Sequence, residues 1–396
     1  MTRWFVPGRL EVFGKHTDYA GGNSLLAAVD RGITIDLEDA AANITATTTA
    51  SDGELVLRDG ESPELPAGHW GGYVVAVLER LRLNFGQIRP ARLRIDSDLP
   101  LASGMSSSSA LVVALALALI DHNNLRETPQ WHDNIRNDVD LAGYMACFEN
   151  GMTFGTLEGV RGVGTFGGSE DHTAMLCCRA DHLTQFRFCP IVEGESVLLG
   201  DELSFVVAVS GVLAEKTGRA LGSYNQASTR TREIVDAWNR ATGRGDVTIA
   251  DALASDDDAR EGLRSVVAHA PELADRLRAF LTESEEIIPA ATASLRRGDL
   301  ASFGELSDLS QRNADQLLGN QVAETNRLQQ LARDLGADAA TSFGAGFGGS
   351  VWALTRTADA AAFGNDWLSR YTSEHPETAG RASVLVTRPG APARRL

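Results

Sequence analysis

The stretch PGRLEVFGKHTDYAGG, residues 7–22, places a cation, an imidazole and a carboxylate between glycines. His16 and Asp18 can donate to and accept from neighbouring hydroxyl groups, as a polyol ligand requires. Glycines on both sides allow the backbone to approach a ligand closely, because they carry no side chain. We interpret the stretch as a polyol-binding loop, with an ordinary polar turn between two strands as the alternative.

Length and charge limit the classes to which the chain can belong. Its 396 residues exceed the size at which a single core stops growing, so two domains or one two-lobed unit are expected. The net charge of −17 argues against nucleic acid or an anionic membrane as the main partner. No secretory signal is visible, and the longest apolar run, residues 110–120, is too short to span a bilayer. We expect a cytoplasmic protein, a monomer or a weak homo-oligomer, that binds small molecules.

Strand-like and helix-like segments alternate along the chain without internal repeats. Period-two patterning and β-branched residues indicate strands, and longer apolar or charged stretches indicate helices. Their order predicts an α+β fold in two domains, residues 1–195 and 196–396, with a loose tail over 387–396. The predicted strands are 33–37, 44–49, 53–57, 91–95, 203–209, 342–354 and 382–386, and the predicted helices are 69–81, 111–120 and several within about 226–335.

A second motif, DLPLASGMSSSSA at residues 98–110, leads directly into the apolar helix. Such a loop presents unpaired backbone N–H groups and the positive end of the helix dipole at one place, which suits a triphosphate. A serine hydroxyl can also ligate Mg²⁺. A flexible linker or a simple helix cap is the alternative, but a linker would not join a strand to a strongly apolar helix. The loop lacks the Gly-Lys-Ser/Thr ending of a Walker A motif, so we predict an anion site of another kind.

The third motif, SFGAGFGGSVW at residues 342–352, has four glycines among six residues before an apolar strand. Glycines at this density allow a loop to lie against another group without steric conflict. We expect that group to be a ligand or the serine-rich loop, with a plain turn between strands as the alternative.

In this order and at these separations, the three motifs resemble the galactokinase branch of the GHMP small-molecule kinases, over nearly the whole chain. HWGGYV at residues 69–74 is similar to the family's Trp-x-Asn-Tyr-Val segment, with Gly72 in place of Asn. The resemblance implies a two-lobed fold, with an N-terminal lobe like the second domain of ribosomal protein S5 and a ferredoxin-like C-terminal lobe. It also implies an enzyme that uses ATP and Mg²⁺ to phosphorylate the anomeric hydroxyl of galactose or a close analogue.

Site roles follow from the same resemblance. GTFGGSEDH at residues 164–172 resembles the segment that ends in the catalytic Asp, which implies that Asp171 orients or deprotonates the acceptor hydroxyl. Arg9 matches the Arg that pairs with it and stabilises the transferred phosphoryl group; a helix cap and a surface arginine are the ordinary alternatives. The other implied contacts are Lys15, His16, Asp18 and Tyr224 to the sugar, Gly104, Ser106, Ser107, Ser108, Gly346 and Gly348 to the ATP phosphates, and Ser107 and Glu149 to the metal.

The metal position has two candidates. Glu149 lies in ACFEN, residues 146–150, which resembles the family's Ala-Glu-Asn helix. The separation between Glu149 and Asp171 is longer than the family's usual spacing, which implies an insertion around residues 156–163. Glu158 lies in that insertion and is the alternative ligand, and a solvated helix glutamate is the ordinary interpretation of Glu149.

Lys15 departs from the family pattern, which has an acid at this position to contact the O6 side of the sugar. Only two of the 36 basic residues are lysines, Lys15 and Lys216, so Lys15 is a candidate for a site that needs a compact ammonium. An ammonium there would favour a carboxylate on the substrate, such as that of galacturonate. Three hypotheses stay open: a galactokinase, favoured by overall similarity; a uronic-acid or other modified-aldose 1-kinase; and a non-catalytic sugar sensor.

Overall fold

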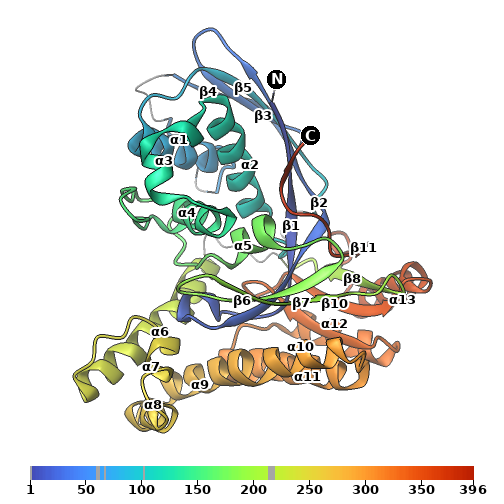
Figure 1. Ribbon diagram of the computed structural model, residues 1–396. Helices are drawn as coiled ribbons and strands as arrows, with labels where there is room; N and C mark the ends of the chain where they lie inside the picture. Colours follow the sequence, from blue (N-terminus) through green and yellow to red (C-terminus); the bar gives the residue numbers. More distant parts are fainter. Residues whose placement is uncertain (1, 59–62, 67, 101–102, 213–218) are drawn as a thin grey trace.

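Two β-sheets organise the structure, a computed structural model that describes residues 2–58, 63–66, 68–100, 103–212 and 219–396 (Figure 1). Within these residues the first sheet has eight strands, in the order β12-β1-β2-β5-β3-β4, with β6 joined to β2 and β7 to β6. The second has four, in the order β11-β8-β10-β9. Their bounds are β1 (Thr2–Phe13), β2 (Asn23–Asp39), β3 (Ile44–Thr48), β4 (Ser51–Leu57), β5 (Ala91–Ser97), β6 (His182–Arg187), β7 (Val192–Leu198), β8 (Leu203–Val209), β9 (Ala339–Phe343), β10 (Ser350–Arg356), β11 (Ser383–Thr387) and β12 (Arg394–Arg395).

Helices cover the first sheet on one side and build most of the second lobe. Figure 1 shows α1 to α4 on one side of the long β1–β2 hairpin, and α2, apolar almost throughout, packs against both strands. Their bounds are α1 (Gly71–Phe85), α2 (Ser107–His122), α3 (Pro129–Asn134), α4 (Asp138–Asn150) and α5 (Glu170–Cys177), then α6 (Arg219–Thr242), α7 (Ile249–Leu253), α8 (Ala259–Val267), α9 (Pro271–Phe280), α10 (Ile288–Arg296), α11 (Leu300–Asn313), α12 (Ala323–Asp334) and α13 (Ala360–Glu374), with π-helical segments at Leu281–Ile287 and Ala314–Leu318.

The opening motif is a strand for almost half of its length, which differs from the predicted loop. Residues 7–13 belong to β1, which pairs with β2 in antiparallel register, and only residues 14–22 form the turn. Every residue from Val6 to Phe13 is buried. A strand that is buried on both faces does not alternate between apolar and polar residues, so its period-two signal is weak.

One hydrophobic core joins the two lobes. Phe13 at the end of β1 meets Phe303 of α11 and Trp352 of β10 edge to face, with ring centroids 5.4 and 5.9 Å apart. The indole N–H of Trp352 donates to the carbonyl of Val12 at 3.2 Å. Aromatic pairs of this kind add about 0.5–1.5 kcal/mol beyond the area that they bury. The end of β1, and with it the turn that follows, is therefore held by both lobes.

The chain passes between the sheets over residues 199–202, because β7 still belongs to the first sheet and β8 to the second. A division at 195/196 would cut through β7, so sheet membership changes a few residues later than the predicted boundary. The two-domain division itself stays a prediction. Among the described residues, none of the helices combines the length and the apolar character that crossing a membrane requires.

The tail is ordered, contrary to the expectation of a loose end. Figure 1 shows the C-terminal end of the chain beside β1, where β12 pairs with Trp4 and Phe5. The N–H of Ala393 donates to the carbonyl of Met175, and that of Leu396 to the carbonyl of Arg3. The exposed edge of β1 offers unpaired N–H and C=O groups, and the tail satisfies them.

Candidate active site

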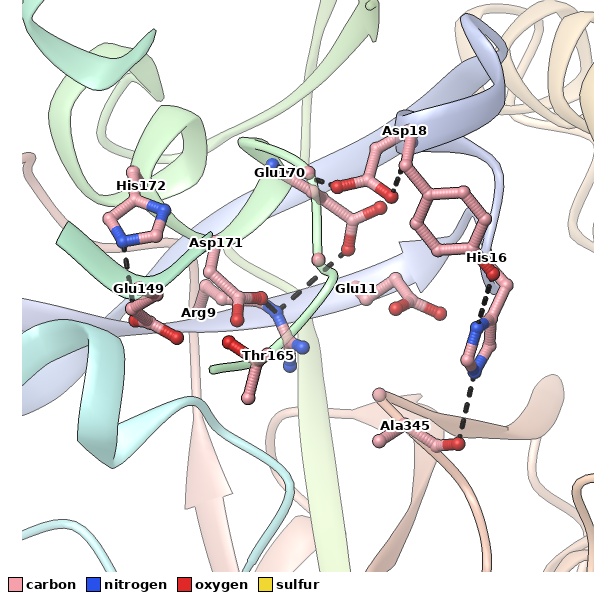
Figure 2. Close-up of a pocket in the computed structure, with 14 residues that line it drawn as sticks. Arg9, Glu11, His16, Asp18, Glu149, Thr165, Glu170, Asp171, His172 and Ala345 are labelled. Carbon is pink, nitrogen blue, oxygen red and sulfur yellow. Dashed lines mark hydrogen bonds and ion pairs between the residues drawn. The ribbon is translucent and has the colours of Figure 1, made fainter. Parts of the chain in front are cut away.

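A pocket opens where β1, the turn after it, the start of α5 and the glycine loop between β9 and β10 meet (Figure 2). Carboxylates dominate its described lining, with one arginine and two imidazoles among them. The lining residues are Arg9, Glu11, His16, Asp18, Tyr19, Glu149, Thr165, Gly167, Gly168, Glu170, Asp171, His172, Gly344 and Ala345.

Arg9 and Asp171 form the central ion pair of this pocket, as the sequence predicts. Nε of Arg9 donates to Oδ1 of Asp171 at 2.6 Å, and Nη1 donates to the carbonyl of Gly104 in the serine-rich loop. Burial alone would lower the pKa of Arg9, but the carboxylates around it, Asp171 foremost, raise it above its ordinary value. The guanidinium therefore stays charged while it links β1, α5 and the loop before α2.

Ser109 holds the second oxygen of Asp171. Its hydroxyl donates to Oδ2 at 3.2 Å from the first turn of α2, where the side chain is fully buried. Asp171 is thus oriented by one cation and one hydroxyl, each acting on a different oxygen. A carboxylate held in this way has a fixed direction, which a group that orients or accepts the proton of a substrate hydroxyl needs.

Asp18 ties the turn after β1 to the start of α5. Its Oδ2 accepts from the backbone N–H of Glu170 at 3.2 Å, and its Oδ1 accepts from the N–H of Tyr19 at 2.8 Å. A Cβ on Gly168 would lie 2.3 Å from Asp18 Oδ2, so a larger residue there would displace the Asp18 carboxylate. Asp18 caps the helix that carries Asp171 and at the same time lines the pocket.

His16 connects the same turn to the third motif. Nε2 lies 3.0 Å from the carbonyl of Ala345, which can only accept, so this nitrogen carries the proton. Nδ1 then accepts from the hydroxyl of Tyr19 at 2.6 Å. The residue adopts a left-handed backbone with φ of 57°, which turns its side chain toward the pocket lining shown in Figure 2.

The glycine loop lies against the serine-rich loop, as the sequence predicts. A Cβ on Gly344 would come within 3.2 Å of the Gly104 carbonyl and 3.6 Å of Arg9 Nη2. Gly346 and Gly348 have positive φ, and a Cβ there would meet Asn320 at 2.3 Å and Val212 at 2.7 Å. These two glycines are needed for packing of the loop, and a role in phosphate binding stays a prediction.

The start of α2 has the features of an anion site. Ser106 precedes the helix in a left-handed conformation, with φ of 54°, and its buried hydroxyl has no hydrogen-bond partner among the described residues. Ser107 and Ser108 follow as the first two helical residues and are half-buried. Free N–H groups and hydroxyls at a helix N-terminus suit phosphate oxygens.

Glu149 lies in the pocket, and Glu158 does not. Glu149 is 8% exposed at the end of α4 and pairs with Nε2 of His172 at 3.3 Å (Figure 2). The Glu158 side chain is exposed and lies outside the described lining. A buried carboxylate and a serine hydroxyl are hard oxygen donors of the kind that Mg²⁺ prefers, so Glu149 and Ser107 fit the metal better than Glu158 does.

Lys15 does not contact the pocket that the sequence assigned to it. Its side chain is 2% exposed, Nζ donates to the hydroxyl of Ser310 at 2.7 Å, and it lies 3.8 Å from Oε1 of Glu283. Neither Lys15 nor these two partners belongs to the described lining of the pocket. The Lys15 ammonium is already paired with Glu283, which argues against the interpretation that it faces a substrate carboxylate.

Tyr224 lies within α6, but its side chain is outside the part of the chain that the structure describes, as is Lys216. The sequence analysis missed Glu11, Ser109, Glu170 and His172. Had residues 7–13 been recognised as a strand, the period of two would have placed Glu11 beside Arg9.

Three family models match the chain. The galactokinase galactose-binding signature matches residues 2–37, the N-terminal domain of the GHMP kinases matches residues 72–152, and their C-terminal domain matches residues 291–372. The first match covers β1 and the turn with His16 and Asp18. The second covers the serine-rich loop, α2 and Glu149.

Relatives and a solved structure agree with these matches. The galactokinase of Actinobacillus succinogenes is 28% identical over 88% of this chain and 84% of its own length. That of Roseiflexus sp. is 27% identical over 97% and 90%. The crystal structure of Lactococcus lactis galactokinase complexed with galactose aligns with a TM-score of 0.82 and 21% identity, over 100% of this chain and 95% of that one. This likeness confirms the predicted fold class.

Proposed function

The chain belongs to the galactokinase branch of the GHMP kinases and is a phosphotransferase that acts on a sugar hydroxyl, and from this premise we propose that it transfers the γ-phosphoryl group of ATP to the anomeric hydroxyl of galactose. The products would be the sugar 1-phosphate and ADP. The observation that carries the proposal is the Arg9–Asp171 ion pair, which lies in the pocket and contacts the serine-rich loop through Gly104.

Asp171 would orient the anomeric hydroxyl and take its proton as the oxygen attacks phosphorus. Arg9, which stays charged, would stabilise the negative charge on the phosphoryl group during transfer. The first turn of α2, with Ser106, Ser107 and Ser108, would bind the phosphates together with Gly104 and the glycine loop. Ser107 and Glu149 would hold Mg²⁺, which neutralises charge on the phosphates.

His16 and Asp18 would bind hydroxyl groups of the sugar, with Tyr224 from α6 as a further contact. Asp18 Oδ1 and Oδ2 already accept from backbone N–H groups, but each carboxylate oxygen can accept more than one hydrogen bond. A cytoplasmic location for the enzyme is part of the same proposal.

The charge of the pocket argues against a sugar-acid substrate. Its described lining holds five carboxyl groups and a single arginine, whose guanidinium is already paired with Asp171. A substrate carboxylate would meet these acidic groups, and the described lining offers no free cation to compensate its charge, which is unfavourable in a buried site. A non-catalytic sensor is also disfavoured, because Arg9, Asp171 and the serine-rich loop are all present.

The test is ADP formation with ATP, Mg²⁺ and a panel of galactose, its epimers and galacturonate, with ³¹P NMR to identify the phosphorylated position. We expect turnover with galactose, a 1-phosphate product and little activity with galacturonate. Sugar and ATP binding without ADP formation for every aldose would instead support the sensor.

A further inference from the structure

Glu11 is a buried acid that the proposed mechanism does not use. It lies on β1 two residues after Arg9, is 3% exposed and lines the pocket. Its Oε1 has no hydrogen-bond partner among the described residues. Figure 2 shows its carboxyl group among the lining side chains, between the Arg9–Asp171 pair and His16 in that view. An unsatisfied buried acceptor costs about 1–3 kcal/mol, more if it is charged, so a partner at this position would be favourable.

The neighbours of Glu11 leave its Oε1 atom without a donor. Arg9 directs its N–H groups to Asp171 and Gly104. Glu170, the other buried acid beside it, accepts from the hydroxyl of Ser24 at 2.7 Å through Oε2 and lies 3.9 Å from Arg9 through Oε1. Glu170 also forms a side-chain hydrogen bond with Glu11, which lowers the pKa of Glu11. Oε1 of Glu11 nevertheless has no partner among the described residues and is left for a donor that the pocket receives.

We propose that Glu11 determines sugar specificity by accepting a hydrogen bond from one hydroxyl group of the acceptor sugar through Oε1. The inference rests on the proposed function and adds a substrate contact to it. At the position that faces Glu11, a hydroxyl group of the sugar can donate to a carboxyl oxygen, whereas a substrate carboxylate cannot.

Burial controls the protonation state of the Glu11 carboxyl group. It raises the pKa of Glu11 to about 7, while Arg9, Lys15 and a hydrogen bond with Glu170 lower it and Glu283 raises it further. Glu170, Asp18 and Asp171 are the other carboxyls of the same lining, and His16 and His172 are its imidazoles. A hydroxyl group that donates to Oε1 favours the charged form, so sugar binding and ionisation of Glu11 support each other.

The experiment compares wild type, Glu11→Gln and Glu11→Met in galactose affinity and in KM for galactose and ATP. The amide oxygen of Gln can still accept a hydrogen bond, and Met fills a similar volume without an acceptor. We expect galactose affinity to fall in the order wild type, Gln, Met, with a loss for Met of roughly 10- to 100-fold and an unchanged KM for ATP. Glu54→Gln, on the exposed part of β4, is the matched control.

A panel of monodeoxygalactoses then identifies the hydroxyl group. The analogue that lacks the partner of Glu11 should bind wild type and Glu11→Met equally, whereas every other analogue keeps the difference. A folded Glu11→Met protein with wild-type affinity for galactose overturns the inference, and so does an equal loss for every sugar of the panel. Failure of the proposed function is a separate result, namely wild-type protein that forms no ADP with any aldose.

Discussion

Lys15 and Glu283 form a buried ion pair between the turn after β1 and the π-helical segment of the second lobe, with Nζ 3.8 Å from Oε1 and both side chains 2% exposed. Ser310 bridges them, since its hydroxyl accepts from Lys15 and lies 2.8 Å from the same carboxylate. Gly14 and Asn313 also donate to Glu283. In this chain, the lysine of the turn is thus neutralised by an acid from the other lobe.

Lys15→Met should therefore reduce stability and leave sugar selectivity unchanged. It leaves Glu283 buried without its cation, for which about 3–5 kcal/mol of lost unfolding free energy is expected. The exchanged pair, Lys15→Glu with Glu283→Lys, should recover part of the loss that Lys15→Glu causes alone. Denaturant unfolding of wild type, Lys15→Glu, Glu283→Lys and the exchanged pair measures this coupling. A stable Lys15→Met enzyme with altered preference between galactose and galacturonate would contradict this prediction and indicate that Lys15 contacts the substrate.

Asp171→Asn should keep sugar binding and lose turnover. The amide preserves the shape of the side chain but cannot take up a proton, so kcat should fall by roughly 10²- to 10⁴-fold. Galactose affinity from calorimetry and kcat from coupled ADP detection separate the two effects. Ser109→Ala is the companion variant, since it removes one hydrogen bond to Asp171 and should cost less. Turnover by Asp171→Asn within a few-fold of wild type would contradict the assignment.

Glu149 and Glu158 give a matched pair for the metal. Glu149→Gln should raise the Mg²⁺ concentration that half-maximal activity requires by roughly tenfold, because a charged ligand becomes a neutral one. Glu158→Gln should leave it unchanged, since that side chain is exposed and outside the pocket lining. Titration of activity with Mg²⁺ at saturating ATP decides between them. The reverse result would assign the metal to the segment around Glu158.

Stability should decrease from pH 4.5 to pH 7 through Glu11. Its pKa rises from 4.5 to about 7 on folding, so in this interval the folded state binds a proton that the unfolded state has released. Raising the pH then favours unfolding. Glu11→Gln removes this contribution and should be more stable than wild type at pH 8, by up to about 3 kcal/mol, with little difference at pH 4.5. Equal pH dependence of unfolding in the two proteins would exclude a raised pKa.

Glu170 should strengthen the same trend, because burial and the carboxylates of Glu11 and Asp18 raise its pKa as well. Glu54→Gln serves as the control for a change of net charge alone, since it lies on the exposed part of β4. If the unfolding free energy of this control changes with pH as that of wild type does, the pH dependence belongs to the buried acids.

Local chemistry in the sequence was sufficient to predict the helix at the serine-rich loop, the packed glycine loop, the family and the fold class. Serines before an apolar run predicted a helix N-terminus, and α2 begins at Ser107, four residues before the predicted start at 111. Glycines at high density predicted a closely packed loop, and Gly344 lies against Gly104. Motif order predicted the family and its fold. Each of these signals depends on neighbours in the chain, through backbone conformation, helix capping or periodicity, so it can be read without the tertiary structure.

Tertiary structure alone decided what the buried charges do. Lys15 is separated from Glu283 in sequence by the rest of the first lobe and part of the second, and only folding shows that the two neutralise each other. Burial on both faces of β1 concealed the strand that carries Arg9 and Glu11 into the pocket. Pairing over a long sequence distance leaves no local periodicity or turn signal, and the fate of an ionisable group depends on which partners folding brings within a few ångströms.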